Sequence, residues 1–394
     1  MENFPTEFLI ITFVAMLAPL LAEIPKSFRL PIIAVEIILG IIIGPHILGL
    51  SKPIGIVAIL GDLGLTFLLF MVGLEIDFDK IRGRPLSLAI SGWFLSLVVA
   101  IVSMSFFNFI GLIQAPPLLT AVALSTTALG VLTPILRDRG ELDSSFGTYM
   151  LAAAAMGELG PLLVISMLII PTQSTMTNIL SIATLIIVAL IVANLALYLR
   201  SAKGIAILTH TTQSSGQLPV RICLLMQIFL VTLAEKFGLN IVIGAFVAGI
   251  VVKATIKGSK NSEENLMKNK LDAIGYGFLI PVFFIVSGMK FEINALWSAP
   301  LAPIQIILLS SLLLFVRGIP LFLYRSELSR EEKLPFAFYS ATGLPLIVVI
   351  SEIGLSSGLM SSDKASILVS AGMLSVLLFP ILADKVRTRY VWPW

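Results

Sequence analysis

Long apolar runs separated by short polar turns make up almost the whole chain. A transmembrane helix needs about 20 mainly apolar residues, and thirteen runs approach or exceed that length. We therefore predict an all-α integral membrane protein with about 13 transmembrane helices. The predicted spans cover residues 6–24, 31–49, 55–75, 86–110, 116–136, 145–170, 178–199, 219–235, 238–254, 271–289, 303–324, 335–356 and 363–383.

Composition agrees with this pattern and excludes several classes of protein. The chain is 57% hydrophobic and 12% charged, whereas soluble domains carry about 25% charged residues. The net charge of +3 comes from basic residues scattered between apolar runs, so we expect no nucleic-acid partner. Cys223 is the single cysteine, and His46 and His210 have no partner at a ligand spacing. We expect no disulfide, resident metal, cofactor or enzymatic activity.

The distribution of Lys and Arg predicts the orientation in the membrane. Twenty-one of the 26 basic residues fall in alternate loops and the C-terminal tail, and four fall on the other side. Cytoplasmic loops carry the excess of Lys and Arg, so we predict an external N-terminus and a cytoplasmic C-terminus. The first apolar run lacks a basic n-region and reads as a retained span. The last span ends about ten residues before Trp394, so we expect no soluble regulatory domain.

Two spans carry helix breakers and hydroxyls near their middle. The fifth contains Ser125-Thr126-Thr127-Ala-Leu-Gly130, with its irregular part expected to end at Pro134; the twelfth contains Ser340-Ala-Thr342-Gly343-Leu-Pro345. They are an odd number of spans apart, so they enter the membrane from opposite sides. Paired interrupted segments in two inverted halves indicate a transporter's binding site. Alternatively, Gly and Pro are simply common in membrane helices.

Glu158 lies near the middle of the sixth predicted span, among Ala, Met, Gly, Leu and Pro. A charged side chain at that depth costs about 2.5 kcal/mol or more on insertion scales. A carboxylate holds a cation when ionised and is neutralised by a proton, so Glu158 is the predicted shared ion and proton site. The alternative is a protonated Glu that donates one structural hydrogen bond. Further candidate ligands are Ser125, Thr126, Thr127, Thr342 and Gly343.

Three other charged residues fall in or beside predicted spans. Arg317 cannot lose its proton and needs an anion or a ring of carbonyls at that depth. We predict that it pairs with Glu158 or neutralises the dipole ends of the broken helices. Glu36 could line an aqueous funnel or pair with another helix. Lys290 is expected at a span end, with its ammonium group reaching the membrane surface.

Several segments together resemble the monovalent cation/proton antiporter-2 superfamily, and the resemblance runs the whole length of the chain. Each segment alone is a weak signal, but their order and spacing are specific. They are Leu30-Pro31 with Glu36-Ile-Ile-Leu-Gly40-Ile-Ile-Ile-Gly44-Pro45, Leu60-Gly-Asp62-Leu-Gly64 with Phe70-Met-Val-Gly73-Leu-Glu75, Ser125-Thr126-Thr127-Ala128, Gly238-Leu-Asn240-Ile-Val-Ile-Gly244-Ala-Phe246-Val-Ala-Gly249, and Pro281-Val-Phe283-Phe284 with Gly288-Met289.

The resemblance implies a sodium/proton antiporter-like fold in one transmembrane transporter domain covering residues 1–394. Core helices would lie at about 86–170 and 303–383, with two crossed discontinuous helices, and the other helices would form a scaffold for a homodimer. The family's ion-binding acid normally belongs to an Asn-Asp, Asp-Asp or Gln-Asp pair. Here that place resembles Gly157-Glu158, so the acid is longer and lacks its polar neighbour. Arg317 matches the family's basic residue.

These observations favour an antiporter in a prokaryotic inner membrane. It would exchange sodium or potassium for protons by alternating access, and a single titrating Glu158 would permit one-for-one exchange. One rival is an inverted-repeat transporter of an organic anion, which Arg317 would suit and Glu158 would repel. The other is a gated cation channel subunit, in which both broken helices would have to line a continuous pore.

Overall fold

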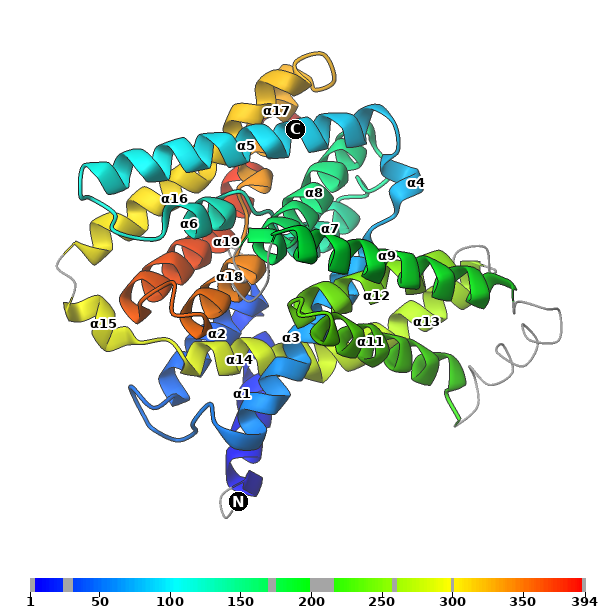
Figure 1. The fold of residues 1–394 in the computed structure, drawn as a ribbon. Coiled ribbons are helices and arrows are strands. Elements are labelled where there is room, and N and C mark those ends of the chain that lie inside the picture. Colours follow the sequence, from blue (N-terminus) through cyan, green and yellow to red (C-terminus); the bar gives the residue numbers. More distant parts are fainter. Residues whose placement is uncertain are drawn as a thin grey trace. The chain divides into compact units, whose positions relative to one another are not determined.

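The computed structural model describes residues 4–23, 31–168, 175–198, 216–256, 261–298 and 301–391. Within these ranges the chain forms helices and no strand (Figure 1). The described residues include nine helices long and apolar enough to cross a membrane, together with four shorter apolar helices. Each predicted span overlaps one of these apolar helices, which confirms the predicted all-α membrane fold. His210 and part of the predicted polar loop at 255–270 lie outside the described residues.

The chain folds into two compact units, each assembled from separate stretches of sequence. The first unit comprises residues 1–15, 53–77 and 166–286. Its complete helices are α3 (Gly55–Glu75), α9 (Thr175–Tyr198), α11 (Leu218–Lys236), α12 (Ile241–Ile256), α13 (Asn261–Ile274) and the π-helical segment η1 (Gly275–Leu279).

The second unit comprises residues 16–52, 78–165 and 287–394, and it contains every residue predicted for the ion site. The predicted core ranges fall within it, apart from residues 166–170. The chain passes between the units within α1 (Phe4–Glu23), α8 (Ser145–Leu168) and α14 (Ile280–Met289). The second unit's other helices are α2 (Ile32–Ile43), α4 (Phe78–Ile81), α5 (Arg84–Phe109), α6 (Pro117–Leu124), α7 (Leu129–Asp138), α15 (Ile293–Ser298), α16 (Ala302–Gly318), the 3₁₀ segment η2 (Ile319–Tyr324), α17 (Arg330–Ser340), α18 (Pro345–Ser356) and α19 (Ser362–Val391).

Small residues allow the helices of the first unit to approach closely. A Cβ placed on Gly73 of α3 would collide with the carbonyl oxygen of Phe246 on α12, and one on Gly249 of α12 would collide with the carbonyl of Phe70. In a membrane, where lipid is as apolar as a helix surface, such close packing is a main source of helix association. The glycines of the predicted motifs therefore serve packing in this unit.

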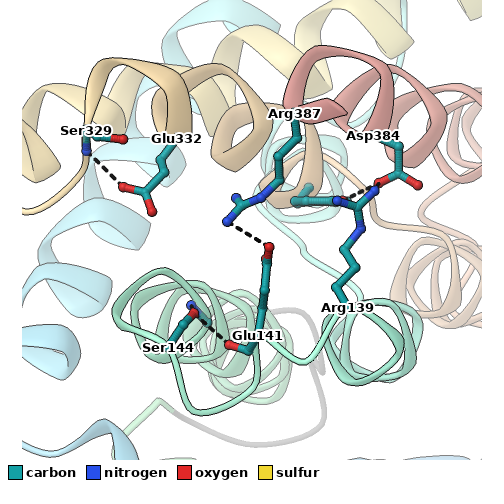
Figure 2. Close-up of polar contacts among 9 residues, drawn as sticks. Arg139, Glu141, Ser144, Ser329, Glu332, Asp384 and Arg387 are labelled. Carbon is teal, nitrogen blue, oxygen red and sulfur yellow. Dashed lines mark hydrogen bonds and ion pairs between the residues drawn. The ribbon is translucent and has the colours of Figure 1, made fainter. Parts of the chain in front are cut away.

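Ion pairs join the turn between α7 and α8 to the C-terminal part of α19 (Figure 2). Arg139 Nη2 lies 2.6 Å from Asp384 Oδ1, and Arg387 Nη2 lies 2.9 Å from Glu141 Oε1. The Arg387 guanidinium also lies 3.9 Å from the centre of the Phe146 ring, a favourable cation–π contact. These contacts hold the C-terminal end of α7 in place, and α7 is one half of the first broken helix.

Candidate functional site

Both predicted broken helices are interrupted in the structure. Residues 125–128 separate α6 from α7, and residues 341–344 separate α17 from α18. The Ser125 and Thr126 hydroxyls each donate to a carbonyl three residues earlier, at 2.8 Å, as α6 ends. Such side chains offer the backbone an alternative to continued helix. At the second interruption, Pro345 occupies the first turn of α18, where its missing N–H leaves no bond unmade.

The prediction that the first irregular segment ends at Pro134 was wrong. The interruption ends at Ala128, and Pro134 lies inside α7. Membrane helices tolerate an internal proline because neighbouring helices and hydroxyl side chains satisfy the freed backbone groups. The four residues at 125–128 are therefore the irregular part of this span.

The two interruptions contact each other through the backbone. The main-chain N–H of Ala128 donates to the carbonyl of Thr342 at 2.7 Å. The Thr127 hydroxyl donates to the carbonyl of Ser340, the last residue of α17, at 2.6 Å. Both bonds join residues more than 200 positions apart, so they fix the crossing of the two broken helices. Thr127 and Thr342 are both fully buried at this crossing.

Gly343 of the second interruption packs against Thr126 of the first, and both are predicted ligands. A Cβ on Gly343 would lie 2.7 Å from Thr126 Oγ1, which is closer than side chains normally approach. The Gly343 N–H donates to the Ser375 hydroxyl of α19 at 3.2 Å. Glycine is thus needed at 343 because the two interruptions are in van der Waals contact there.

Glu158 projects from α8 to the start of α7. Its Oε1 accepts a hydrogen bond from the main-chain N–H of Leu129, the first residue of α7, at 2.8 Å. The side chain is 2% exposed. The first N–H groups of a helix have no partner within the helix and carry partial positive charge, which favours an anion. The carboxylate therefore lies at the one end of α7 that stabilises its negative charge.

Gly157, next to the acid, packs directly on the first interruption. The Thr127 N–H donates to the Gly157 carbonyl at 3.2 Å. A Cβ on Gly157 would lie 2.7 Å from Thr127 Cβ and 2.8 Å from its Oγ1. The structure therefore leaves no room for a side chain at position 157.

Arg317 lies on α16, and its guanidinium group contacts the C-terminal end of α17, the first half of the second broken helix. Its Nε donates to the Ser340 carbonyl at 3.3 Å, Nη1 donates to the Ser96 hydroxyl at 3.3 Å, and Nη2 donates to the Ala153 carbonyl at 3.2 Å. These three hydrogen bonds go to acceptors other than Glu158, and direct pairing of Arg317 with Glu158 stays a prediction. Contact with the carbonyl end of α17 is the other arrangement predicted, and it occurs because that helix end carries partial negative charge.

The two intramembrane charges are thus matched to helix ends of opposite sign. Glu158 lies at the N-terminal end of α7, and Arg317 lies at the C-terminal end of α17. The Ser340 carbonyl accepts from both Arg317 and Thr127, which links the basic residue to the first interruption. This arrangement stabilises an ionised carboxylate at the crossing while leaving the guanidinium bonded elsewhere. A carboxylate held in this way is available to a cation or a proton.

Three more residues singled out in the sequence have definite positions. Ser125 is fully buried at the first interruption. Glu36 is 4% exposed on α2, among packed helices, and its role in a funnel stays a prediction. Lys290 directly follows α14 and forms an ion pair with Glu352 of α18; its reach to the membrane surface stays a prediction.

Sequence reasoning missed three contributors to the site. Ser96 accepts from Arg317 and donates to the Val316 carbonyl at 3.0 Å, and Ser375 accepts from Gly343. A serine in an apolar helix is too common to identify either one. Gly157 was noticed only as a departure from the family pattern, and its steric role depends on contact with Thr127.

Comparisons with known proteins agree with this geometry. The sequence profile described as "Sodium/hydrogen exchanger, transmembrane" matches residues 11–384. The putative Na⁺/H⁺ antiporter YjbQ of Bacillus subtilis is 28% identical over 96% of this chain, which spans 62% of that relative's length. The probable Na⁺/H⁺ antiporter 3 of Methanocaldococcus jannaschii is 25% identical over 98% of this chain and 97% of that protein.

A solved structure supports the same fold. The sodium proton antiporter MjNhaP1 from Methanocaldococcus jannaschii superposes with a TM-score of 0.71 over 99% of both chains, at 16% sequence identity. At that identity the likeness concerns the fold. The profile match covers nearly the whole chain, including both interruptions and the acid. The chain therefore belongs to the transmembrane sodium/hydrogen exchanger family.

Proposed function

We propose that this protein exchanges a monovalent cation, sodium or potassium, for protons across a prokaryotic inner membrane. The observation that carries the proposal is the buried carboxylate of Glu158 at the crossing of two broken helices, bonded to the first N–H of α7. Family membership and the names of the relatives support it. One relative, GerN of Bacillus cereus, is named as a Na⁺/H⁺-K⁺ antiporter, which supports keeping both cations as candidates.

Coupling follows from competition at one carboxylate. A proton neutralises Glu158, and a neutral carboxyl group has lost the charge that would hold a cation. An ionised Glu158 is stabilised by the N-terminal end of α7 and can take a cation together with the hydroxyl oxygens of Thr126 and Thr127. Proton and cation therefore occupy the site alternately. Because Glu158 is 2% exposed, loading it from either side requires a rearrangement of the crossing.

Burial and charge also bear on the rival functions. An organic anion would be repelled by Glu158, and Arg317 already bonds to Ser340, Ser96 and Ala153 rather than facing a free site. Membership of an exchanger family argues against a channel subunit. We further propose a homodimer with an external N-terminus and a cytoplasmic C-terminus, the orientation favoured by the distribution of Lys and Arg.

The test is cation-dependent recovery of an imposed pH gradient in proteoliposomes, with lithium, sodium, potassium and rubidium added in turn. We expect Glu158→Gln to abolish exchange while the protein folds, because the amide keeps the shape but cannot bind or release a proton. Glu158→Asp should retain some exchange with altered ion preference, since its carboxylate is one methylene shorter. The matched control is Asp143→Asn, whose side chain is 84% exposed. Substantial cation-dependent proton flux in folded Glu158→Gln would refute the assignment.

A further inference from the structure

A pocket lies in the second unit between α14, α18 and α19, with one residue contributed by α2. Four serines, one lysine and one glutamate give it a polar lining among apolar side chains. Its lining residues are Ile37, Ser287, Lys290, Phe291, Val348, Ser351, Glu352, Leu355, Ser362, Ala365, Ser366 and Val369. The described Glu158 contacts do not involve this pocket, so it is a separate feature of the same unit.

Two of its serines lack the hydrogen bond that hydroxyls on membrane helices usually make. Hydroxyls in membrane helices usually donate to a carbonyl one turn back, as Ser310, Ser311 and Ser370 do here at 2.8 Å. The buried Oγ atoms of Ser287 and Ser351 have no hydrogen-bond partner among the described residues, and Ser351 is 2% exposed. Buried hydroxyls without a partner are unfavourable. Both residues line the pocket, so a cation bound there is a candidate partner for their hydroxyl oxygens.

The charged groups of the pocket form an ion pair that a small ion could separate. Lys290 Nζ contacts Glu352 Oε1, and the two side chains are 33% and 23% exposed. Neither side chain is fully buried, and partly exposed ion pairs contribute little to stability, so the ammonium group is a displaceable occupant of the carboxylate. Without it, the pocket presents a carboxylate and hydroxyl oxygens. Oxygen ligands of this kind replace the hydration shell of an alkali cation.

Helix α18 connects the pocket to the crossing of the two broken helices. Pro345 begins α18 directly after the second interruption, and Glu352 follows seven residues later. At 1.5 Å per residue, this separation is about 10 Å along the helix axis. Glu352 of the pocket therefore lies between the crossing and the C-terminal end of α18.

We propose that Ser287, Ser351 and Glu352 form a second monovalent-cation site, which Lys290 occupies through its ammonium group when the ion is absent. The proposal rests on the proposed cation/proton exchange and adds a loading site to it. Removal of Lys290 then favours cation binding, because the carboxylate no longer has an internal competitor. Removal of Glu352 or the Ser351 hydroxyl weakens cation binding without touching Glu158.

Direct binding separates this site from the one at Glu158. Sodium and rubidium binding is measured on purified Glu158→Gln protein, in which the central carboxylate is absent. We expect saturable binding to remain in Glu158→Gln and to be lost when Glu352→Gln is added. Adding Lys290→Met instead should tighten binding about ten-fold if the ammonium occupies the carboxylate in about nine of ten molecules. Absence of cation binding in Glu158→Gln would overturn the proposal, as would equal binding with and without Glu352→Gln.

Transport by the otherwise unaltered protein gives a second readout. Lys290→Met should lower the cation concentration for half-maximal exchange, and Ser351→Ala should raise it. The matched controls are Ser311→Ala, whose hydroxyl donates to its own helix, and Lys80→Met, whose pair with Asp143 is exposed. Both controls should leave that concentration unchanged. If Lys290→Met instead weakens cation dependence, or if chloride rather than a cation binds to Glu158→Gln, the pocket is not a cation site. Exchange that persists in Glu158→Gln would refute the central assignment but not this one.

Discussion

Replacing Gly157 tests whether the crossing is packed as described. In Gly157→Ala the new Cβ would lie 2.7 Å from Thr127 Cβ and 3.0 Å from the Thr127 main-chain N. Carbon atoms pack best at about 3.5–4.0 Å, so the first contact is about 0.8 Å too short. Thr127 cannot rotate away without losing the 2.6 Å bond from its hydroxyl to the Ser340 carbonyl. The substitution therefore pushes the first interruption away from Glu158.

The expected magnitude follows from two opposing effects. Overpacking of a buried site costs about 1–3 kcal/mol, and the upper part of this range applies because Thr127 is fully buried and hydrogen-bonded. Alanine in place of glycine within α8 gains about 1 kcal/mol of helix propensity. The net destabilisation should be about 2 kcal/mol. The exchange rate should also fall, even under conditions in which the variant stays folded, because the displaced interruption carries the predicted ligands.

The assay combines denaturant unfolding in mixed micelles with cation-dependent proton flux in proteoliposomes. Gly277→Ala is the matched control, since a Cβ there meets nothing within 4 Å. A second variant, Thr127→Gly, removes two of the three crowded atoms and should recover part of the loss when combined with Gly157→Ala, as an interaction energy of about 1 kcal/mol. If Gly157→Ala matches the unaltered protein in both stability and flux, the described contact between Gly157 and Thr127 is wrong.

Three further predictions address the rest of the site and its frame. Arg317→Lys should lower the free energy of unfolding by about 1–3 kcal/mol. One ammonium group cannot reach all three acceptors, and each lost hydrogen bond contributes about 0.5–1.5 kcal/mol. An unchanged free energy of unfolding would show that the three-way contact of the guanidinium group is not needed. Single cysteines at Asn3 and Tyr390, in a cysteine-free background, should react with an impermeant thiol reagent from opposite sides of the membrane; reaction from one side would mean a miscounted span. The Tyr149 hydroxyl donates to Glu327 at 2.7 Å and holds the pKa of that carboxyl below its ordinary value. The pair therefore stabilises the fold at pH values above the unfolded-state pKa of about 4.3. This stabilisation is lost as the pH falls through the lower pKa of the folded state. Tyr149→Phe should therefore be less stable than the unaltered protein at about pH 6, with a gap in thermal midpoint that narrows in acid; a gap independent of pH would contradict the pairing.

The sequence by itself determined where helices cross the membrane and where two of them break. Hydrophobic run length and helix-breaking residues act locally, so they are visible without knowledge of the fold. Glu158 and Arg317 were also identifiable, because a charge within an apolar run is unfavourable wherever the run packs. The sequence misplaced the end of the first interruption because a proline in a membrane helix need not break it.

Tertiary structure decided which of these features meet. The bonds from Ala128 to Thr342 and from Thr127 to Ser340 join residues more than 200 positions apart, and no local pattern specifies them. Packing also gave Arg317 the carbonyl end of α17 as a partner. Several partners were plausible for each charge in the sequence. Only the placement of the half-helix ends selected among them, because the dipole at each end attracts a charge of the opposite sign within a few ångströms.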